Sequence, residues 1–174
     1  MDPDLRRFAV EVFCRTMLMR GQVESHRRLT DLVNQVEPYL AMIEVYTHPY
    51  SVSSVPALES HQQGIISKTS IVMVAELEPA ATTLATPVET GMRIPKMPHR
   101  ILAFTDDFAI NADIHLTEGA DMATFLTMSQ SKFLPVTRAT VHPTQPGTQL
   151  TSFERPFLLI NGEQIVYLGA STPD

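Results

Sequence analysis

Hydrophobic and polar residues alternate along several short stretches of this chain. In residues 108–116, FAINADIHL, the first residue and every second one after it are apolar, whereas Asn111, Asp113 and His115 fall between them. A period of two is typical of a β-strand with one buried and one solvated face. A weaker version occurs at residues 17–24, MLMRGQVE, at an offset of 91 residues (108 − 17 = 91). We therefore interpret the chain as two divergent copies of one small β-rich unit.

The first copy is predicted to contain four strands and one short helix. The strands are expected at residues 6–14, 17–24, 39–46 and 65–77. Leu29, Leu32 and Val33 have the spacing of an apolar helix face. This helix is expected to end at Pro38 or at the residue before it, because a residue that precedes proline avoids helical geometry. The apolar run inside 65–77 is long enough to favour a single strand that is covered on both faces.

The second copy is predicted to repeat this order and to end in a hairpin. Its strands are expected at residues 99–105, 108–116, 132–141, 150–160 and 164–168, and a helix over 122–128. Asp121 is a good N-cap for that helix. The pair Asn161-Gly162 is typical of a two-residue type I′ turn, because both residues tolerate a positive φ. It predicts that the last two strands pair with each other.

These elements favour a mainly β fold of the α+β kind. We expect a tandem duplication of a β-β-α-β-β unit, packed as a pseudo-dimeric sheet or barrel, with repeats at 1–77 and 99–174. Residues 78–98 contain four prolines and four threonines, which predicts an extended linker. Residues 47–63 form a long polar loop, which suits a docking loop or a mobile excursion.

Composition narrows the classes of function. The chain has 174 residues, of which 44% are hydrophobic and 18% charged, and its formal net charge is −6. An acidic chain is a poor ligand for nucleic acid, which needs clustered Lys and Arg. No run approaches the ~18 apolar residues of a spanning helix, and we expect no secretory signal. The single cysteine, Cys14, allows no internal disulfide. Together these features predict a soluble cytoplasmic protein.

Candidate catalytic or metal-binding chemistry is sparse. The six histidines are scattered and lack the close spacing of a metal site. Lys68 and Lys132 lie near serines, but we interpret both as ordinary solvent-facing lysines, and Cys14 as a buried, inert thiol. There is no glycine-rich phosphate loop. We therefore predict no catalytic set, no cofactor and no metal site.

Residues 28–34, Arg-Leu-Thr-Asp-Leu-Val-Asn, follow a glycine strand and precede the aromatic-leucine pair Tyr39-Leu40. In this the chain resembles an uncharacterised bacterial family of small duplicated β-rich domains with the motif R-L-[ST]-D-x-[LV]-N. The second copy departs from the motif, with Met122, Thr124 and Thr127 at three of its positions. The resemblance implies the duplicated fold and carries no activity.

The function that the sequence favours is a non-catalytic protein-interaction or assembly subunit, with a protein partner or a homo-oligomer. Interaction residues are expected at the short helix and the long loop, namely Arg28, Asp31, Asn34, Tyr46, His48 and Tyr50. Of these, Asp31 or Asn34 is a candidate to bond a neighbouring copy. The alternative is a small-ligand-binding or enzymatic barrel with a pocket between the repeats, lined by Tyr39, His48, His115 or Arg138.

Overall fold

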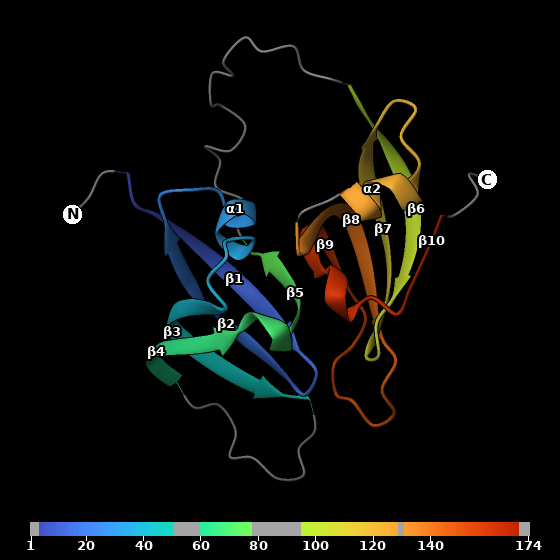
Figure 1. The fold of residues 1–174 in the computed structure, drawn as a ribbon. Helices are drawn as coiled ribbons and strands as arrows, with labels where there is room; N and C mark the ends of the chain where they lie inside the picture. The colour runs from blue at the N-terminus through green and yellow to red at the C-terminus, as the bar shows by residue number, and fades with distance from the viewer. Residues whose placement is uncertain (1–3, 51–59, 78–94, 129–130, 171–174) are drawn as a thin grey trace.

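Ten antiparallel β-strands form one sheet in the computed structural model, which describes residues 4–50, 60–77, 95–128 and 131–170 (Figure 1). The strand order is β10-β6-β7-β8-β9-β5-β1-β2-β3-β4, and the two end strands do not pair with each other. The predicted mainly β fold is confirmed, as an open sheet and not a closed barrel. Residues 78–94 of the predicted linker 78–98 lie outside the described residues, as do residues 51–59 of the predicted loop 47–63. The linker and the loop are shorter than predicted, because strands occupy Lys96–Phe104, Tyr39–Pro49 and Ser60–Ser67.

The two halves of the chain contain the same kinds of element. In the first half these are β1 (Arg6–Cys14), β2 (Met17–Ser25), α1 (Leu29–Val33), β3 (Tyr39–Pro49), β4 (Ser60–Ser67), the 3₁₀-helix η1 (Lys68–Ser70) and β5 (Ile71–Glu76). In the second half they are β6 (Lys96–Phe104), β7 (Phe108–Thr117), α2 (Met122–Met128), β8 (Phe133–Pro143), β9 (Phe153–Asn161), η3 (Gly162–Gln164) and β10 (Tyr167–Ala170).

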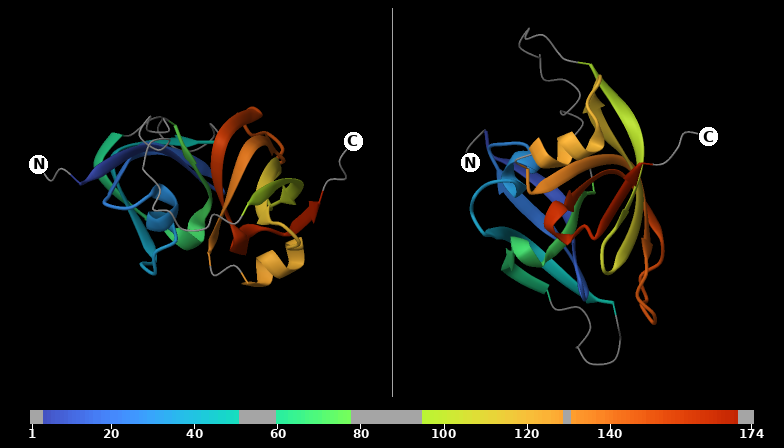
Figure 2. Two further views of the ribbon diagram at one scale, coloured as in Figure 1. Left: turned by 90° about the horizontal axis from the view of Figure 1, so that it is seen from above. Right: turned by 45° about the vertical axis from the view of Figure 1, so that its right-hand side comes forward.

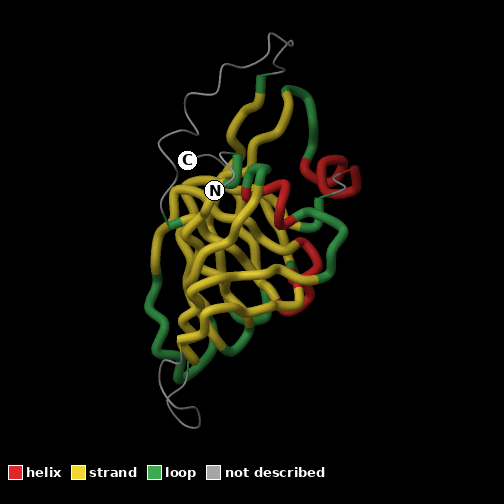
Figure 3. Tube along the Cα trace, turned by 90° about the vertical axis from the view of Figure 1, so that its left-hand side faces the viewer, coloured by secondary structure: helices red, strands yellow, loops and turns green. Residues whose placement is uncertain are grey.

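The halves form two curled lobes that lie side by side, with β5 and β9 between them (Figure 2). The short helices lie along one flank of the strands (Figure 3). Strand order is β5-β1-β2-β3-β4 in the first lobe and β10-β6-β7-β8-β9 in the second. None of the helices in the described part of the chain is long and apolar enough to cross a membrane.

Each lobe bends at a bulge, and the two bulges lie in corresponding pairs of strands. The β2–β3 register shifts between Arg20 and Gln22, and the β7–β8 register shifts between Asn111 and Asp113. The partner strands carry the positive-φ residues Glu44 and Arg138 at these bulges. Such a residue in the left-handed region increases the local twist, which lets a strand curl over its core.

Three predictions about local structure are wrong. Residues 65–77 are not one strand, because η1 separates the end of β4 from β5, so the first lobe has five strands instead of the four predicted. Asn161-Gly162 does not form a hairpin: β9 leads into η3, and β10 pairs with β6 instead. The φ of Asn161 is −68°, so the positive φ of a type I′ turn is absent. Local turn propensity was overridden by long-range strand pairing.

Lys68 is also not solvent-facing as predicted, since only 3% of it is exposed. Its Nζ donates hydrogen bonds to the carbonyl oxygens of Gln35, at 2.9 Å, and Leu32, at 3.4 Å. These carbonyls lie at the C-terminal end of α1, where a cation is favoured and acceptors lack helix partners. Burial lowers the pKa of the Lys68 amine. The lysine therefore attaches α1 to η1.

The two lobes meet where β5 pairs with β9, and we call this joint the seam. Met73 lies opposite Ile160, Val74 opposite Leu159, and Ala75 opposite Leu158. Leu159 belongs to the apolar cluster of the first lobe, whereas Met73 and Ala75 belong to that of the second. Each lobe thus supplies side chains to the core of the other, as alternation along paired strands requires.

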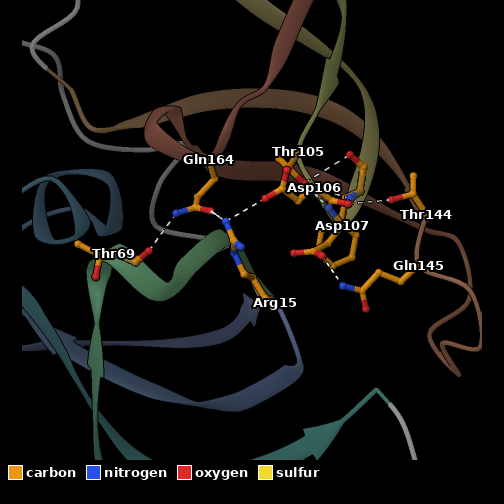
Figure 4. Close-up of polar contacts among 9 residues, drawn as sticks. Arg15, Thr69, Thr105, Asp106, Asp107, Thr144, Gln145 and Gln164 are labelled. Atoms are coloured by element: carbon orange, nitrogen blue, oxygen red, sulfur yellow. Dashed lines mark hydrogen bonds and ion pairs between the residues drawn. The ribbon is translucent and has the colours of Figure 1, made fainter.

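Polar side chains reinforce the seam beyond the Met73–Ile160 end of these apolar pairs, where β9 leads into η3. The buried Asn161 donates from Nδ2 to the carbonyl oxygens of Ile71, at 2.8 Å, and Lys68, at 3.2 Å. Gln164 donates to the Thr69 carbonyl at 3.0 Å and accepts from Arg15 at 3.2 Å (Figure 4). These directional bonds fix how β9 lies along β5.

A buried carboxylate also joins the two lobes. Glu11 on β1 is fully buried and accepts from Arg20 Nε on β2 at 2.8 Å. Its second oxygen accepts from Arg155 Nε on β9 at 3.0 Å, across the intervening β5. A buried charge is tolerated only with such partners, because desolvation is costly.

We predict that Glu11→Ala lowers the free energy of unfolding by about 2–4 kcal/mol, because it leaves two arginines without their shared partner. Glu24→Ala is the matched control, since Glu24 pairs with Arg7 in an exposed position and should cost at most about 1 kcal/mol. Urea denaturation followed by circular dichroism measures both. Equal losses would contradict a special role for the buried pair.

Candidate functional site

The outer edge of β4 is one surface that the fold leaves open. Among the described strands β4 pairs with β3 alone, and Ile65 lies opposite Ala41. Because successive side chains point to opposite faces, Ile66 is buried whereas Ile65 is 75% exposed. A hollow of about 540 Å³ beside them is lined in part by Met17 and Met19. An apolar surface therefore accompanies this strand edge.

The outer edge of β10 is the corresponding surface of the second lobe. β10 pairs with β6, where Tyr167 lies opposite Phe104, and no other described strand covers it. Val166 is 70% and Tyr167 56% exposed. A groove of about 460 Å³ runs beside these residues and is lined in part by Leu126 and Leu168. The two edges lie at opposite ends of the molecule (Figures 1 and 2).

Neither edge carries a charged residue or a proline as protection against strand pairing, although β10 is short, with four residues. Natural sheet edges are generally blunted by charged residues, prolines or bulges. Residues 60–67, SHQQGIIS, and 167–170, YLGA, contain no Lys, Arg, Asp, Glu or Pro. The edges are therefore chemically suited to accept a further strand.

The residues predicted on α1 lie in two different settings. Arg28 and Asp31 are exposed, and these two described residues make no ion pair with each other. Asn34 faces the other lobe: its Oδ1 accepts from the Phe133 amide at 2.8 Å, and its Nδ2 donates to the Phe133 carbonyl at 3.1 Å. Of the motif that ends at Asn34, Leu29 and Val33 are buried. The motif thus docks α1 on the core and on β8.

The residues predicted on the long loop are divided between surface and interior. Tyr46 is exposed on β3, and His48 is half-buried. Tyr50 is buried with its ring edge-to-face on Phe108, and its carbonyl accepts from the Gln149 amide at 2.9 Å. Burial raises the pKa of the Tyr50 phenol. Tyr50 therefore helps to join the lobes and is not displayed at the surface.

The four residues expected around a ligand pocket do not converge among the described cavities. Arg138 lines a cavity of about 670 Å³ together with Arg100 and Arg155, whereas Tyr39, His48 and His115 do not line it. Arg100 and Arg138 both pair with the buried Asp113, and Arg155 pairs with Glu11. Each guanidinium has a carboxylate partner, but Arg100 and Arg138 share Asp113 and Arg155 shares Glu11 with Arg20, so each carboxylate is divided between two arginines.

Reactive and metal-binding side chains are dispersed. No group of three or more His, Cys, Asp or Glu that could hold a metal ion occurs among the described residues. His115 bonds the Thr137 hydroxyl at 2.9 Å, and His142 bonds the Ser152 hydroxyl at 2.9 Å. Cys14 is buried, and burial raises the pKa of its thiol to about 11. At neutral pH this thiol is protonated and a poor nucleophile.

The sequence alone did not identify the two open edges as candidate sites. In the hydrophobic pattern of the sequence, Ile65 and Val166 look like ordinary core residues. Their exposure depends on which strands lie at the ends of the sheet, and the sequence does not show this. The available signal was the absence of charge and proline from residues 60–67 and 167–170.

Comparison with protein-family models, curated proteins and solved structures finds no match to this chain. The family resemblance of the 28–34 motif therefore stays a prediction.

We predict that alkylation of Cys14 by iodoacetamide keeps rising about tenfold per pH unit up to pH 10 in the folded protein. Thiolate is the reactive form, and the folded pKa is about 11. In urea the rate should level off above the ordinary value of ~8.5. The single cysteine makes mass spectrometry a direct readout. A folded-state profile that levels off near pH 9 would show that the thiol is not buried.

Proposed function

We propose that this protein is a non-catalytic assembly subunit that binds another protein chain by strand addition at the open edges β4 and β10. The observation that carries the proposal is that both edges lack charge and proline while exposing aliphatic side chains. Main-chain pairing at a sheet edge supplies affinity, and side chains beside it supply specificity.

The chemistry of the exposed residues supports this function. Isolated surface leucines or valines are common and need no explanation. Here, however, Ile65 and Val166 each lie next to a hollow and next to a strand edge. An exposed, flat and apolar edge is an aggregation hazard in a free protein. A dedicated partner strand removes that hazard and gives the residues a role.

We further propose that the chain is a tandem duplication, now with five strands in each unit. The strand pairings support an offset of 91 across β1 and β2 and a constant offset of 94 from β3 onward. Tyr39 pairs with Ser67 and Phe133 with Asn161, so that both members of the pair differ by 94 (133 − 39 and 161 − 67). The positive-φ residues Glu44 and Arg138 differ by the same 94. Shared order, register and bulges are difficult to attribute to chance.

We predict that Ile65→Lys abolishes partner binding, because a lysine at the edge opposes strand addition. Val36→Lys is the matched control: Val36 is 99% exposed and lies between α1 and β3, away from the edge. Light scattering gives the mass of the pure proteins, and affinity capture from cells of the source organism detects other partners.

The proposed function requires that wild-type protein and Val36→Lys bind a partner or self-associate, and that Ile65→Lys does not. A monomeric wild-type protein, together with identical capture by all three proteins, would contradict it.

A further inference from the structure

We infer that the partner at these edges is a second copy of this chain, joined head to tail, with β4 of one copy pairing with β10 of the next. This inference rests on the proposed function and names its partner. At the seam the same two kinds of edge already meet within one chain.

The seam joins an edge of the β4 kind to an edge of the β10 kind. In the second lobe β9 has the place that β4 has in the first, beside β8 as β4 is beside β3. In the first lobe β5 has the place that β10 has in the second, beside β1 as β10 is beside β6. One edge of each kind is satisfied by the seam, and among the strands that the structure describes nothing pairs with the other two, which lie at opposite ends of the molecule (Figure 1).

The register of the seam transfers directly to the open edges. Phe13 pairs with Met73 and Phe104 with Tyr167, so β5 and β10 also correspond at an offset of 94 (167 − 73). The seam pairs Met73–Ile160, Val74–Leu159 and Ala75–Leu158 therefore become three pairs between copies. These pairs are Tyr167–Ile66, Leu168–Ile65 and Gly169–Gly64.

Residues at the open edges are exposed, whereas the corresponding residues at β5 and β9 are buried, as a joint between copies requires. Ile65 is 75% exposed, whereas its counterpart Leu159 is fully buried in the seam. Val166 is 70% exposed, and its counterpart Val72 is 1% exposed. Tyr167 is 56% exposed, and its counterpart Met73 is fully buried. The side chains remain apolar where the chain alone gives them no cover, which indicates that another copy supplies it.

The joint between copies lacks part of what stabilises the seam. Leu102 corresponds to Glu11 at the offset of 91, so the buried carboxylate that reaches across the seam to Arg155 has no equivalent. Each copy also carries a net charge of −6, which opposes association at low ionic strength. We therefore expect a reversible joint that is strengthened by salt. Because it is heterologous, repetition gives a ring if the rotation closes and a filament if it does not.

The decisive experiment mixes two variants, each with one blocked edge. Ile65→Lys blocks β4, and Val166→Lys blocks β10, since its counterpart Val72 on β5 is buried. Val36→Lys is the control with the same change of side chain at an exposed site. Sedimentation velocity at ~0.15 M salt, a physiological ionic strength, gives the masses, and thermal melts monitor folding.

We expect wild-type protein and Val36→Lys to exceed the monomer mass of 19.4 kDa, and each blocked variant alone to be monomeric. An equimolar mixture of the blocked variants should form a dimer and nothing larger, because the intact β10 of one meets the intact β4 of the other. A dimer of either blocked variant alone indicates pairing of like edges and overturns the inference. A monomeric wild-type protein, or a monomeric mixture, overturns it as well.

A crosslink provides a second measurement if a lysine variant fails to fold. A chain carrying Ile65→Cys and Leu168→Cys should form a ladder of disulfide-linked copies under mild oxidation, whereas either single variant should not; absence of the ladder overturns the inference. The buried Cys14 is present in every sample and serves as background. If the wild-type protein is monomeric but Ile65→Lys loses a foreign partner, the inference fails and the proposed function stands.

Discussion

The pairing of β5 with β9 is the interaction on which the rest of the structure depends. Each lobe is a curled sheet too small to enclose its own core, and the seam supplies the missing wall. Leu159 of the second lobe completes the first apolar cluster, and Met73 of the first lobe completes the second. Because the exchange is mutual, neither lobe keeps its core intact without the other. Burial of apolar surface at the seam is thus a condition of the fold.

Apolar pairs alone do not fix the register of such a joint, since a slip of two residues leaves the same faces buried. Directional polar contacts remove that ambiguity. Asn161 reaches two carbonyls on either side of η1, Asn34 binds both main-chain groups of Phe133, and Glu11 holds Arg155 from across β5. A shifted register leaves these polar groups without hydrogen-bond partners. The free-energy cost of that loss exceeds the difference in apolar burial between the two registers.

The sequence predicted strand positions well because alternation is a local property. It predicted β7 at 108–116, and the strand ends one residue later at Thr117. It failed where the outcome depends on distant chain: Asn161-Gly162 resembles a hairpin turn, yet Asn161 is held by Lys68 and Ile71 of the other lobe. The candidate site was missed for the same reason, because it also depends on distant parts of the chain. Exposure of Ile65 follows from the strand that β4 lacks, and hydrophobic periodicity carries no information about missing neighbours.

The open edges follow from the topology of the unit itself. A five-stranded unit with the order β5-β1-β2-β3-β4 ends in two different edges. Joining units in tandem satisfies one pair of edges at each seam and always leaves one edge of each kind at the ends. Adding units to the chain moves these edges apart without removing them. Evolution can blunt them with charge or proline, as most proteins do, or keep them apolar for pairing. Residues 60–67 and 167–170 contain neither charge nor proline. In the duplication and the assembly that we propose, both follow from one complementary pair of edges.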